Sequence, residues 1–255
     1  MLVNSTKTRL AEGTPVFGCF LRYAEPSLAE FIALQGWDFM VLDGEHGTLE
    51  PRDIENLARA VELRGVTPIA RVPTNQPHDI LRFLDTGIHG VHVPWVNSAA
   101  EAQDAIRSVK YWPKGHRGLA GSRASLWGMT EPIGAYTVRA NEETLVVVHI
   151  ETIAAVNAID DYVALDGLDV LFIGPTDLSH SLGHPGDTNH PEVVEAMDTV
   201  AAAVIPSGKA LGIFVGNADV AATWVSRGAT YVATGPDGFL KKGMQQYLED
   251  VRGTP

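Results

Sequence analysis

The sequence predicts one domain over residues 1–255 that folds as a (β/α)8 TIM barrel. Short β-branched apolar runs alternate with helical patterns from end to end, and eight such runs match the strand number of this barrel. Runs that are apolar throughout are typical of parallel strands buried on both faces. The count and the length favour closure over a doubly wound open sheet. The expected strands are residues 15–21, 39–43, 67–71, 90–94, 144–150, 169–174, 211–215 and 230–234.

Proline and glycine mark the ends of the expected helices. Proline suits the first turn of a helix, where its missing N–H has no partner to lose. Glycine suits the residue after the last turn, because it adopts left-handed backbone angles without strain. Ser98 and Glu101 have the spacing of a capping box at another helix start. The prolines at starts are Pro26, Pro51, Pro77 and Pro191, and the glycines at ends are Gly36, Gly65, Gly87, Gly208 and Gly228.

Composition narrows the class of protein. A hydrophobic content of 45% and a charged content of 20% are ordinary for a globular enzyme. The net charge of −12 argues against nucleic acids and anionic membranes as partners. One cysteine, Cys19, excludes an internal disulfide and suits a reducing compartment. The first ten residues lack the apolar core of a signal peptide, and no segment has the length of a transmembrane helix, so we expect a cytoplasmic protein.

Residues 112–141 form a segment longer than a plain connection between elements of a barrel. Basic residues gather in it among several glycines: Lys114, His116, Arg117 and Arg123. We expect this insertion to be a partly ordered lid over the barrel mouth, or a subunit contact.

Two carboxylates follow neighbouring strands of the expected barrel. Glu151 comes directly after the run 145–150, and Asp177 comes shortly after the run 169–174. The carboxyl ends of parallel strands meet at one rim, where barrel enzymes bind their ligands. Two acids side by side need a cation to stay ionised, so the pair favours a divalent metal held by oxygen ligands. The alternative is that each acid caps the helix that follows it.

His46 lies in the sequence DGEHG at residues 43–47, directly after the second expected strand. The flanking glycines leave the imidazole accessible, and its ordinary pKa near neutrality lets it act as an acid or a base. Asp43 and Glu45 flank it, and either can orient the ring. This pattern favours a catalytic role for His46 over a structural one, with Asp43 in support. The other histidines, including His184 and His190, show no zinc-binding pattern.

Arg71 ends the third expected strand, so its guanidinium should emerge at the same rim. There it can grip a carboxylate or stabilise an oxyanion, and an ion pair with Asp43 or Glu151 is compatible with that role. Asp85, late in the helix expected over residues 77–86, reads from its position alone as a surface carboxylate.

The lysines separate two mechanisms of carbonyl activation. A Schiff-base enzyme needs a lysine inside the barrel. None of the six lysines lies in an expected strand or at a strand end of the catalytic rim. Carbonyl activation is therefore left to a metal that the substrate chelates, and two carboxylate ligands suit a magnesium-like ion.

Four spaced segments resemble the HpcH/HpaI family of metal-dependent 2-oxo acid aldolases. They are LDGEHG at 42–47, YWPKGHRG at 111–118, IETIAAV at 150–156 and FIGPTDLS at 172–179. The resemblance implies a barrel of the pyruvate/phosphoenolpyruvate type that uses Mg²⁺, Mn²⁺ or Co²⁺. It also implies a homohexamer, a trimer of dimers whose subunits exchange the last helix.

The resemblance also implies roles for individual residues. Glu151 and Asp177 match the metal ligands, and Arg71 matches the residue that steadies the enolate oxygen. His46 matches the base. Asp85 falls where the family has the aspartate that pairs with this histidine, which replaces its reading as a surface residue.

For the substrate, the resemblance implies that backbone amides after the sixth strand hold the pyruvate carboxylate. The residues there are Gly174, Pro175 and Thr176. His149 stands where relatives often carry glutamine beside the metal ligand. Phe214 stands where a smaller aliphatic residue often lines the aldehyde side, which suggests a tighter pocket.

The expected reaction is reversible aldol cleavage of a 4-hydroxy-2-oxo acid to pyruvate, or hydroxypyruvate, and an aldehyde. The nearest alternative is decarboxylation of oxaloacetate through the same enolate. A phosphate-binding isomerase or transferase would use the glycine turns at 216–217 and 235–238, which carry no lysine or arginine. A non-catalytic metabolite-binding barrel is the third alternative, and the set of acid, base and arginine residues argues against it.

Overall fold

The computed structural model describes residues 3–253 and shows a closed barrel of eight parallel strands in chain order. Each strand pairs with the next, and β8 pairs with β1 to close the sheet. All eight expected strands are confirmed, with bounds that differ by no more than one residue. They are β1 Val16–Leu21, β2 Phe39–Asp43, β3 Thr67–Arg71, β4 Gly90–Val93, β5 Leu145–Ile150, β6 Val170–Ile173, β7 Ala210–Phe214 and β8 Tyr231–Thr234.

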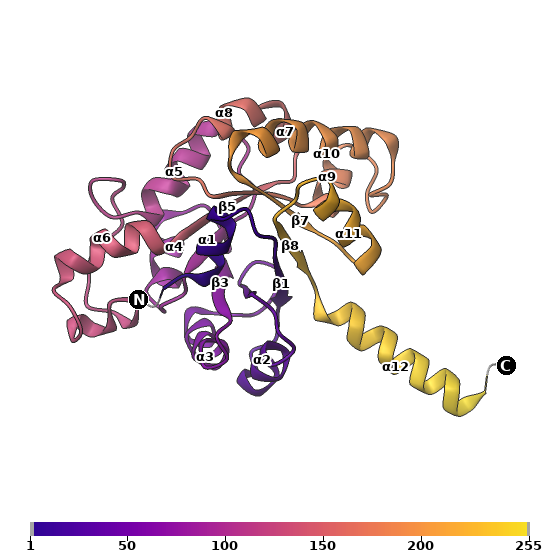
Figure 1. Cartoon of the computed structure of the whole chain (residues 1–255), viewed down its shortest axis with the longest axis horizontal. Helices are drawn as coiled ribbons and strands as arrows, with labels where there is room; N and C mark the ends of the chain where they lie inside the picture. The colour runs from indigo at the N-terminus through magenta and orange to yellow at the C-terminus, as the bar shows by residue number, and fades with distance from the viewer. Residues whose placement is uncertain (1–2, 254–255) are drawn as a thin grey trace.

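Helices surround the strands (Figure 1). Their bounds are α1 Ser5–Ala11, α2 Pro26–Ala33, α3 Pro51–Glu62, α4 Pro77–Leu84, α5 Ala99–Val109, η1 Arg123–Gly128, α6 Ile133–Glu143, α7 Ile153–Asn157, α8 Ile159–Val163, α9 Pro175–Ser181, α10 Pro191–Val204, η2 Ile205–Ser207, α11 Ala218–Ser226 and α12 Pro236–Arg252. Among residues 3–253, no helix combines the length and the apolar character that a membrane span requires.

The helix boundaries follow the expected chemistry. The four prolines begin α2, α3, α4 and α10. The five expected glycine stops all have positive φ, between 74° and 109°. At the start of α5 the Ser98 side chain accepts a hydrogen bond from the Glu101 amide, as predicted. The Glu101 carboxylate accepts from the Asn97 amide instead of the Ser98 amide, so the capping box is one residue wider than expected.

Strand residues alternate between two apolar layers. One layer lies between the strands and the helices, and the other fills the barrel interior, where Phe39 stacks on Tyr231 with ring centroids 4.1 Å apart. Every strand except β4 adds a hydrophobic residue to the interior layer. On β4 the buried residue between Val91 and Val93 is a histidine, His92.

The insertion at residues 112–141 corrects one expectation. Arg123 donates to the Thr86 carbonyl and pairs with Glu62, and Arg117 pairs with Asp85. These partners end α3 and α4, and barrel helices run antiparallel to the strands. The insertion therefore lies at the amino ends of the strands, and within one chain it is not a lid over the mouth. Its alternative role as a subunit contact stays a prediction.

Helix α12 projects from the barrel, with the C-terminus at its far end (Figure 1). Only Pro236 of this helix is buried. Several large apolar side chains along it are exposed: Phe239, Leu240, Met244, Tyr247, Leu248 and Val251. Apart from Phe239, whose ring stacks on Trp37, these side chains extend along a helix that packs little against its own chain.

Gly18 gives a test of interior packing. A Cβ atom at Gly18 would lie 2.0 Å from the ring of Phe39, which is fully buried. Gly18→Ala should lower the free energy of unfolding by about 1–3 kcal/mol, because the ring has no room to retreat. Gly134→Ala is the control, since no neighbouring atom of the described residues 3–253 lies within 4 Å of its added methyl group. Urea unfolding should show a loss for Gly18→Ala alone, and equal stability of the two variants would contradict this packing.

Candidate active site

A cavity of about 340 Å³ opens at the carboxyl ends of the strands and brings together ten of the eleven residues singled out from the sequence. They are Asp43, His46, Arg71, His149, Glu151, Gly174, Pro175, Thr176, Asp177 and Phe214. Asp85 is the exception. These residues come from β2, β3, β5, β6 and β7 or the turns that follow, so the closed barrel gathers one wall from five separate parts of the chain.

Glu151 directly follows β5 and is 2% exposed. Its Oε1 accepts a hydrogen bond from the Trp95 amide at 2.7 Å, and its Oε2 lies 3.0 Å from His149 Nδ1. Burial alone would raise the pKa of Glu151, but His149, the Trp95 amide and Arg71 together lower it below the ordinary value. Glu151 is therefore an ionised carboxylate at the base of the cavity.

Two neighbouring backbones are shaped around this carboxylate. Trp95 has a left-handed φ of 53°, unusual for a residue other than glycine, and its amide points at Glu151. Gly174, after β6, passes so close that a Cβ atom there would lie 3.0 Å from Glu151 Oε2. The β4 and β6 loops thus hold Glu151 from two sides.

Asp177 lies in the first turn of α9 and is half-buried. Within residues 3–253 no protein group forms a hydrogen bond or ion pair with its carboxylate. The capping alternative is wrong for both acids, because Gly174 is the N-cap of α9 and Thr152 is the N-cap of α7. Glu151 and Asp177 instead present hard oxygen donors to one cavity, which fits a divalent cation that keeps other positions for small ligands.

Arg71 is anchored by two acids at the cavity wall. Its Nε and NH2 donate to the two carboxylate oxygens of Asp43, at 2.9 and 2.7 Å, and its NH1 lies 3.0 Å from Glu45 Oε2. Its guanidinium also lies over the ring of Phe20, 5.1 Å from the centroid. A bidentate pair of this kind fixes the plane of the guanidinium toward the cavity.

Asp43 forms the ion pair with Arg71 that the sequence allowed, and it does not orient the His46 ring. Its carboxylate accepts from Arg71 and from the amides of Glu45 and His46. It forms no hydrogen bond with the His46 ring within residues 3–253. Burial alone would raise the pKa of Asp43, but Arg71 and these two amides lower it below the ordinary value. Asp43 thus positions Arg71 and the turn that carries His46.

The expected pair of His46 and Asp85 is not formed within one chain. His46 is exposed at the lip of the cavity. Asp85 is the C-cap of α4, at the amino end of the barrel, where its Oδ1 lies 2.8 Å from Arg117 NH2. Because α4 runs antiparallel to the strands, its last residues reach the end opposite to the mouth.

Two charged residues of the cavity were missed in the sequence. Arg22 and Asp237 line it, they pair with each other, and the Tyr23 hydroxyl donates to Asp237 at 2.5 Å. Arg22 directly follows β1, so the rule that active-site residues follow strands could have found it. Asp237 lies in the first turn of α12, and its partner is more than 200 residues away in the chain.

Among residues 3–253, no lysine lines the cavity, as the sequence predicts. Lys110 is buried, and burial lowers its pKa to about 7. Its Nζ donates to the carbonyls of Asn141 and Thr144, just before β5 begins. This amine therefore lies at the amino end of the barrel and cannot reach a carbonyl substrate in the mouth.

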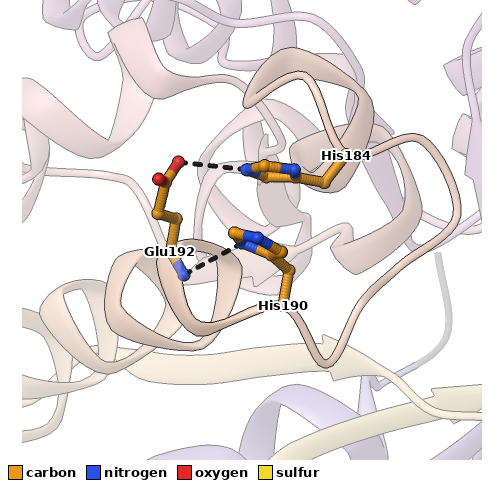
Figure 2. A group of neighbouring side chains, drawn as sticks. All are labelled: His184, His190 and Glu192. Atoms are coloured by element: carbon orange, nitrogen blue, oxygen red, sulfur yellow. Dashed lines mark hydrogen bonds and ion pairs between the residues drawn. The ribbon is translucent and has the colours of Figure 1, made fainter.

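A second cluster of possible ligands lies outside the cavity (Figure 2). His184 Nε2 is 3.1 Å from Glu192 Oε2, and His190 Nδ1 accepts from the Glu192 amide as the N-cap of α10. The two imidazoles stack with centroids 3.4 Å apart and an angle of 18° between their planes. The lone pairs of two parallel imidazoles point side by side instead of toward one shared ion. His190 already caps α10, so the cluster has the geometry of a helix cap and not of a metal site.

Fold and site together define a (β/α)8 barrel enzyme with ionised acids, an anchored arginine and no lysine in its mouth. The HpcH/HpaI aldolase/citrate lyase family matches residues 16–242. The chain belongs to this family, as its motifs predict, and it is a carbon–carbon lyase of the aldolase type.

Similar proteins cover the whole barrel. The 5-keto-4-deoxy-D-glucarate aldolase of Escherichia fergusonii is 35% identical over 254 residues, which span 98% of this chain and 97% of that protein. The hydroxypyruvate/pyruvate aldolase of Roseovarius nubinhibens is 35% identical over 237 residues, or 92% and 91% of the two chains. The crystal structure of a family protein from Burkholderia cenocepacia has a TM-score of 0.93 and 34% identity, covering 98% of this chain and 100% of that one.

The ion pair of Asp43 predicts a pH dependence of stability. Its pKa is lower in the folded protein than in the unfolded chain, where it is about 3.9. The stabilisation is therefore fully present above pH 4 and is lost as the pH falls through the folded pKa. Asp43→Asn should flatten the decline of the unfolding free energy as the pH falls below about 4. The exposed Asp104→Asn is the control, and parallel pH curves for both variants and the parent would rule out the proposed contribution.

Proposed function

We propose that the protein is a divalent-metal-dependent aldolase that reversibly cleaves a 4-hydroxy-2-oxo acid to pyruvate, or hydroxypyruvate, and an aldehyde. The observation that carries this proposal is the shared cavity of Glu151, Asp177 and Arg71. Two relatives at 35% identity are named for 2-oxo acid aldol chemistry, one of them for hydroxypyruvate and pyruvate.

Each part of the cavity suits one part of such a substrate. A cation held by Glu151 and Asp177 would polarise the ketone and neutralise charge on its oxygen. The first-turn amides of α9, at Thr176 and Asp177, have no partners within the helix and suit the substrate carboxylate. The guanidinium of Arg71 suits the oxygen of the ketone carbon. Apolar rings of Phe20 and Phe214 line the same cavity and narrow its remaining wall.

The proton and electron transfers of the cleavage are then assigned to this chain. His46 takes the proton of the 4-hydroxyl, the C4–O bond becomes a carbonyl, and the C3–C4 bond breaks. The electron pair of the C3–C4 bond moves to form the enolate of pyruvate, and the enolate oxygen gains negative charge beside Arg71. Because Asp43 and Glu45 hold the guanidinium in place beforehand, little reorganisation is needed as the charge develops. Protonation at C3, with the proton that His46 accepted, restores the base and releases pyruvate.

We also propose the assembly that the resemblance implies, in which subunits exchange their last helix. The outer barrel face beside the start of α12 has an apolar hollow of about 500 Å³, lined by Phe17, Trp37, Val225 and Val232 among others. In a barrel the helix after the last strand ordinarily covers this face, yet α12 projects away (Figure 1). A partner's α12 would bury both apolar surfaces, and an assembly would also allow Asp85 of one subunit to approach His46 of another.

Glu151→Gln tests the metal site. The substitution keeps the shape of the side chain and removes its charge, so Mn²⁺ affinity should fall by more than about 100-fold, beyond the loss typical for outer partners of metal ligands. Aldol cleavage should fall with it. Electron paramagnetic resonance reports Mn²⁺ binding directly, and the exposed Glu195→Gln serves as a matched control. Full turnover of Glu151→Gln in metal-free buffer would refute the proposal.

A donor and acceptor screen tests the reaction itself. Pyruvate and hydroxypyruvate are each incubated with a panel of aldehydes, with and without Mn²⁺, and oxaloacetate is run in parallel. We expect carbon–carbon bond formation and exchange of the pyruvate methyl protons that both require the metal. Faster turnover of oxaloacetate than of every hydroxy-oxo acid would favour the decarboxylase instead. Absence of metal-dependent proton exchange would exclude an enolate mechanism altogether.

The exposed face of α12 gives a test of the assembly. Met244 and Leu248 lie one turn apart on this helix and are exposed in the chain. Replacing both with aspartate should convert the hexamer to smaller species in size-exclusion chromatography with light scattering. Gln246→Asp, which lies on the opposite side of the helix, should leave the mass unchanged. A parent protein that is itself monomeric would overturn the proposed exchange.

A further inference from the structure

Three polar side chains form a hydrogen-bonded chain through the apolar barrel interior, beneath the candidate metal site. The Tyr231 hydroxyl lies 2.8 Å from His92 Nε2, and His92 Nδ1 lies 3.0 Å from His149 Nε2. His149 Nδ1 in turn lies 3.0 Å from Glu151 Oε2. With Glu151, which directly follows β5, these side chains come from β8, β4 and β5, so only the closed barrel brings them together.

The chain has little room to take another arrangement. Tyr231 and His92 are fully buried, and His149 is 2% exposed. The rings of Phe20 and Phe172 pack around His92, with centroids 5.5 and 5.0 Å away. Apolar rings offer no competing strong donors or acceptors, so each polar atom of the chain depends on its neighbour within it.

The direction of the three hydrogen bonds follows from which groups carry protons. Burial raises the pKa of Tyr231 well above its ordinary value, so its hydroxyl keeps its hydrogen. Burial lowers the pKa of His92 well below its ordinary value, so His92 is neutral and has one N–H. The ionised Glu151 can only accept. His149 therefore donates from Nδ1, His92 donates from Nδ1 to His149 Nε2, and Tyr231 donates to His92 Nε2.

The opposite direction of the hydrogen bonds would leave a donor unsatisfied at Tyr231. A His149 that donated from Nε2 would force His92 to donate to the Tyr231 oxygen. The hydroxyl hydrogen of Tyr231 would then have no acceptor among residues 3–253 other than the chain itself. An unsatisfied buried donor costs about 1–3 kcal/mol. Tyr231 thus biases the whole chain toward the arrangement in which His149 presents an N–H to Glu151.

We propose that His92 and Tyr231 are positioning residues of the active site, which act through the tautomer of His149 to orient the Glu151 carboxylate for a divalent cation. This inference rests on the proposed metal-dependent function. With Oε2 held by His149 and Oε1 held by the Trp95 amide, the carboxylate cannot rotate, and its remaining lone pairs face the cavity. Partners of a metal ligand that fix its orientation typically change metal affinity 10–100-fold when they are removed.

The test compares three changes in the chain with one outside it. His92→Leu removes the donor to His149. His92→Asn keeps an amide that can donate from the position of Nδ1. Tyr231→Phe keeps the ring stacked on Phe39 and removes only the hydroxyl. His89→Leu is the matched control, because His89 is also buried and pairs with Glu62 at 3.2 Å, at the amino end of the barrel.

The readouts are the Mn²⁺ dissociation constant from electron paramagnetic resonance and the unfolding free energy from urea titration. His92→Leu should raise the dissociation constant at least 10-fold, Tyr231→Phe should raise it less, and His92→Asn should restore it to within about 3-fold of the parent. His89→Leu should lower stability and leave the dissociation constant unchanged. Parent-like Mn²⁺ affinity of both His92→Leu and Tyr231→Phe would overturn the inference, as would an equal loss in His89→Leu.

A third readout does not need the metal. The ¹⁵N chemical shifts of His149 in the metal-free protein, assigned by comparison with His149→Gln, distinguish its two tautomers. We expect the hydrogen on Nδ1 in the parent and a mixture of tautomers in His92→Leu. A hydrogen on Nε2 in the parent would refute the chain even if Mn²⁺ binds. A parent that has this tautomer but binds no Mn²⁺ would instead refute the proposed metal-dependent function.

Discussion

A buried, ionised carboxylate at Glu151 is the constraint around which the active end of this barrel is organised. A charge removed from water is stable only where hydrogen bonds and opposite charges replace the water. Here the Trp95 amide, the His149 ring and the nearby Arg71 replace it, and each comes from a different part of the chain. To aim its amide, Trp95 adopts a left-handed backbone, and to leave room, residue 174 is a glycine. The left-handed backbone of Trp95 and the glycine at position 174 are thus both explained by the position of the Glu151 carboxylate.

The two ends of the barrel have different roles: the amino ends of the strands carry structural ion pairs, and the carboxyl ends carry the candidate active site. At the amino ends of the strands, the pairs of Asp85 with Arg117 and of Glu62 with Arg123 join the 112–141 insertion to the helices. At the carboxyl ends, Asp43 and Glu45 hold Arg71, and Asp177 stays without a protein partner within residues 3–253. Despite a net charge of −12, the mouth therefore contains an arginine in a fixed plane as well as free oxygen ligands. Under the proposed function, this arginine and a cation held by the carboxylates would let an anionic substrate enter an acidic protein.

The residues that sequence reasoning placed well share one property: their position follows from the strand that precedes them. The strand-end rule found Glu151, Arg71 and the DGEHG turn because every strand of a parallel barrel ends at the same rim. The same rule would have found Arg22, which follows β1. It misassigned the 112–141 insertion, because a connection that follows a helix returns to the amino end. It could not connect Asp85 to His46 either, since the end of α4 lies at the far side of the same chain.

Local chemistry in the sequence was enough to determine the eight strands, the proline and glycine boundaries of the helices, and the family of the protein, because these depend on near neighbours in the chain. Only the tertiary structure decided that Asp43 serves Arg71 and not the His46 ring, since a carboxylate bonds to whichever donor the closed sheet brings to it. The polar chain from Tyr231 to Glu151 is also a product of closure. His92 and Tyr231 are 139 residues apart, and each alone reads as an ordinary strand residue. Their hydrogen bond exists because the barrel has one interior, in which polar atoms from distant strands must satisfy one another.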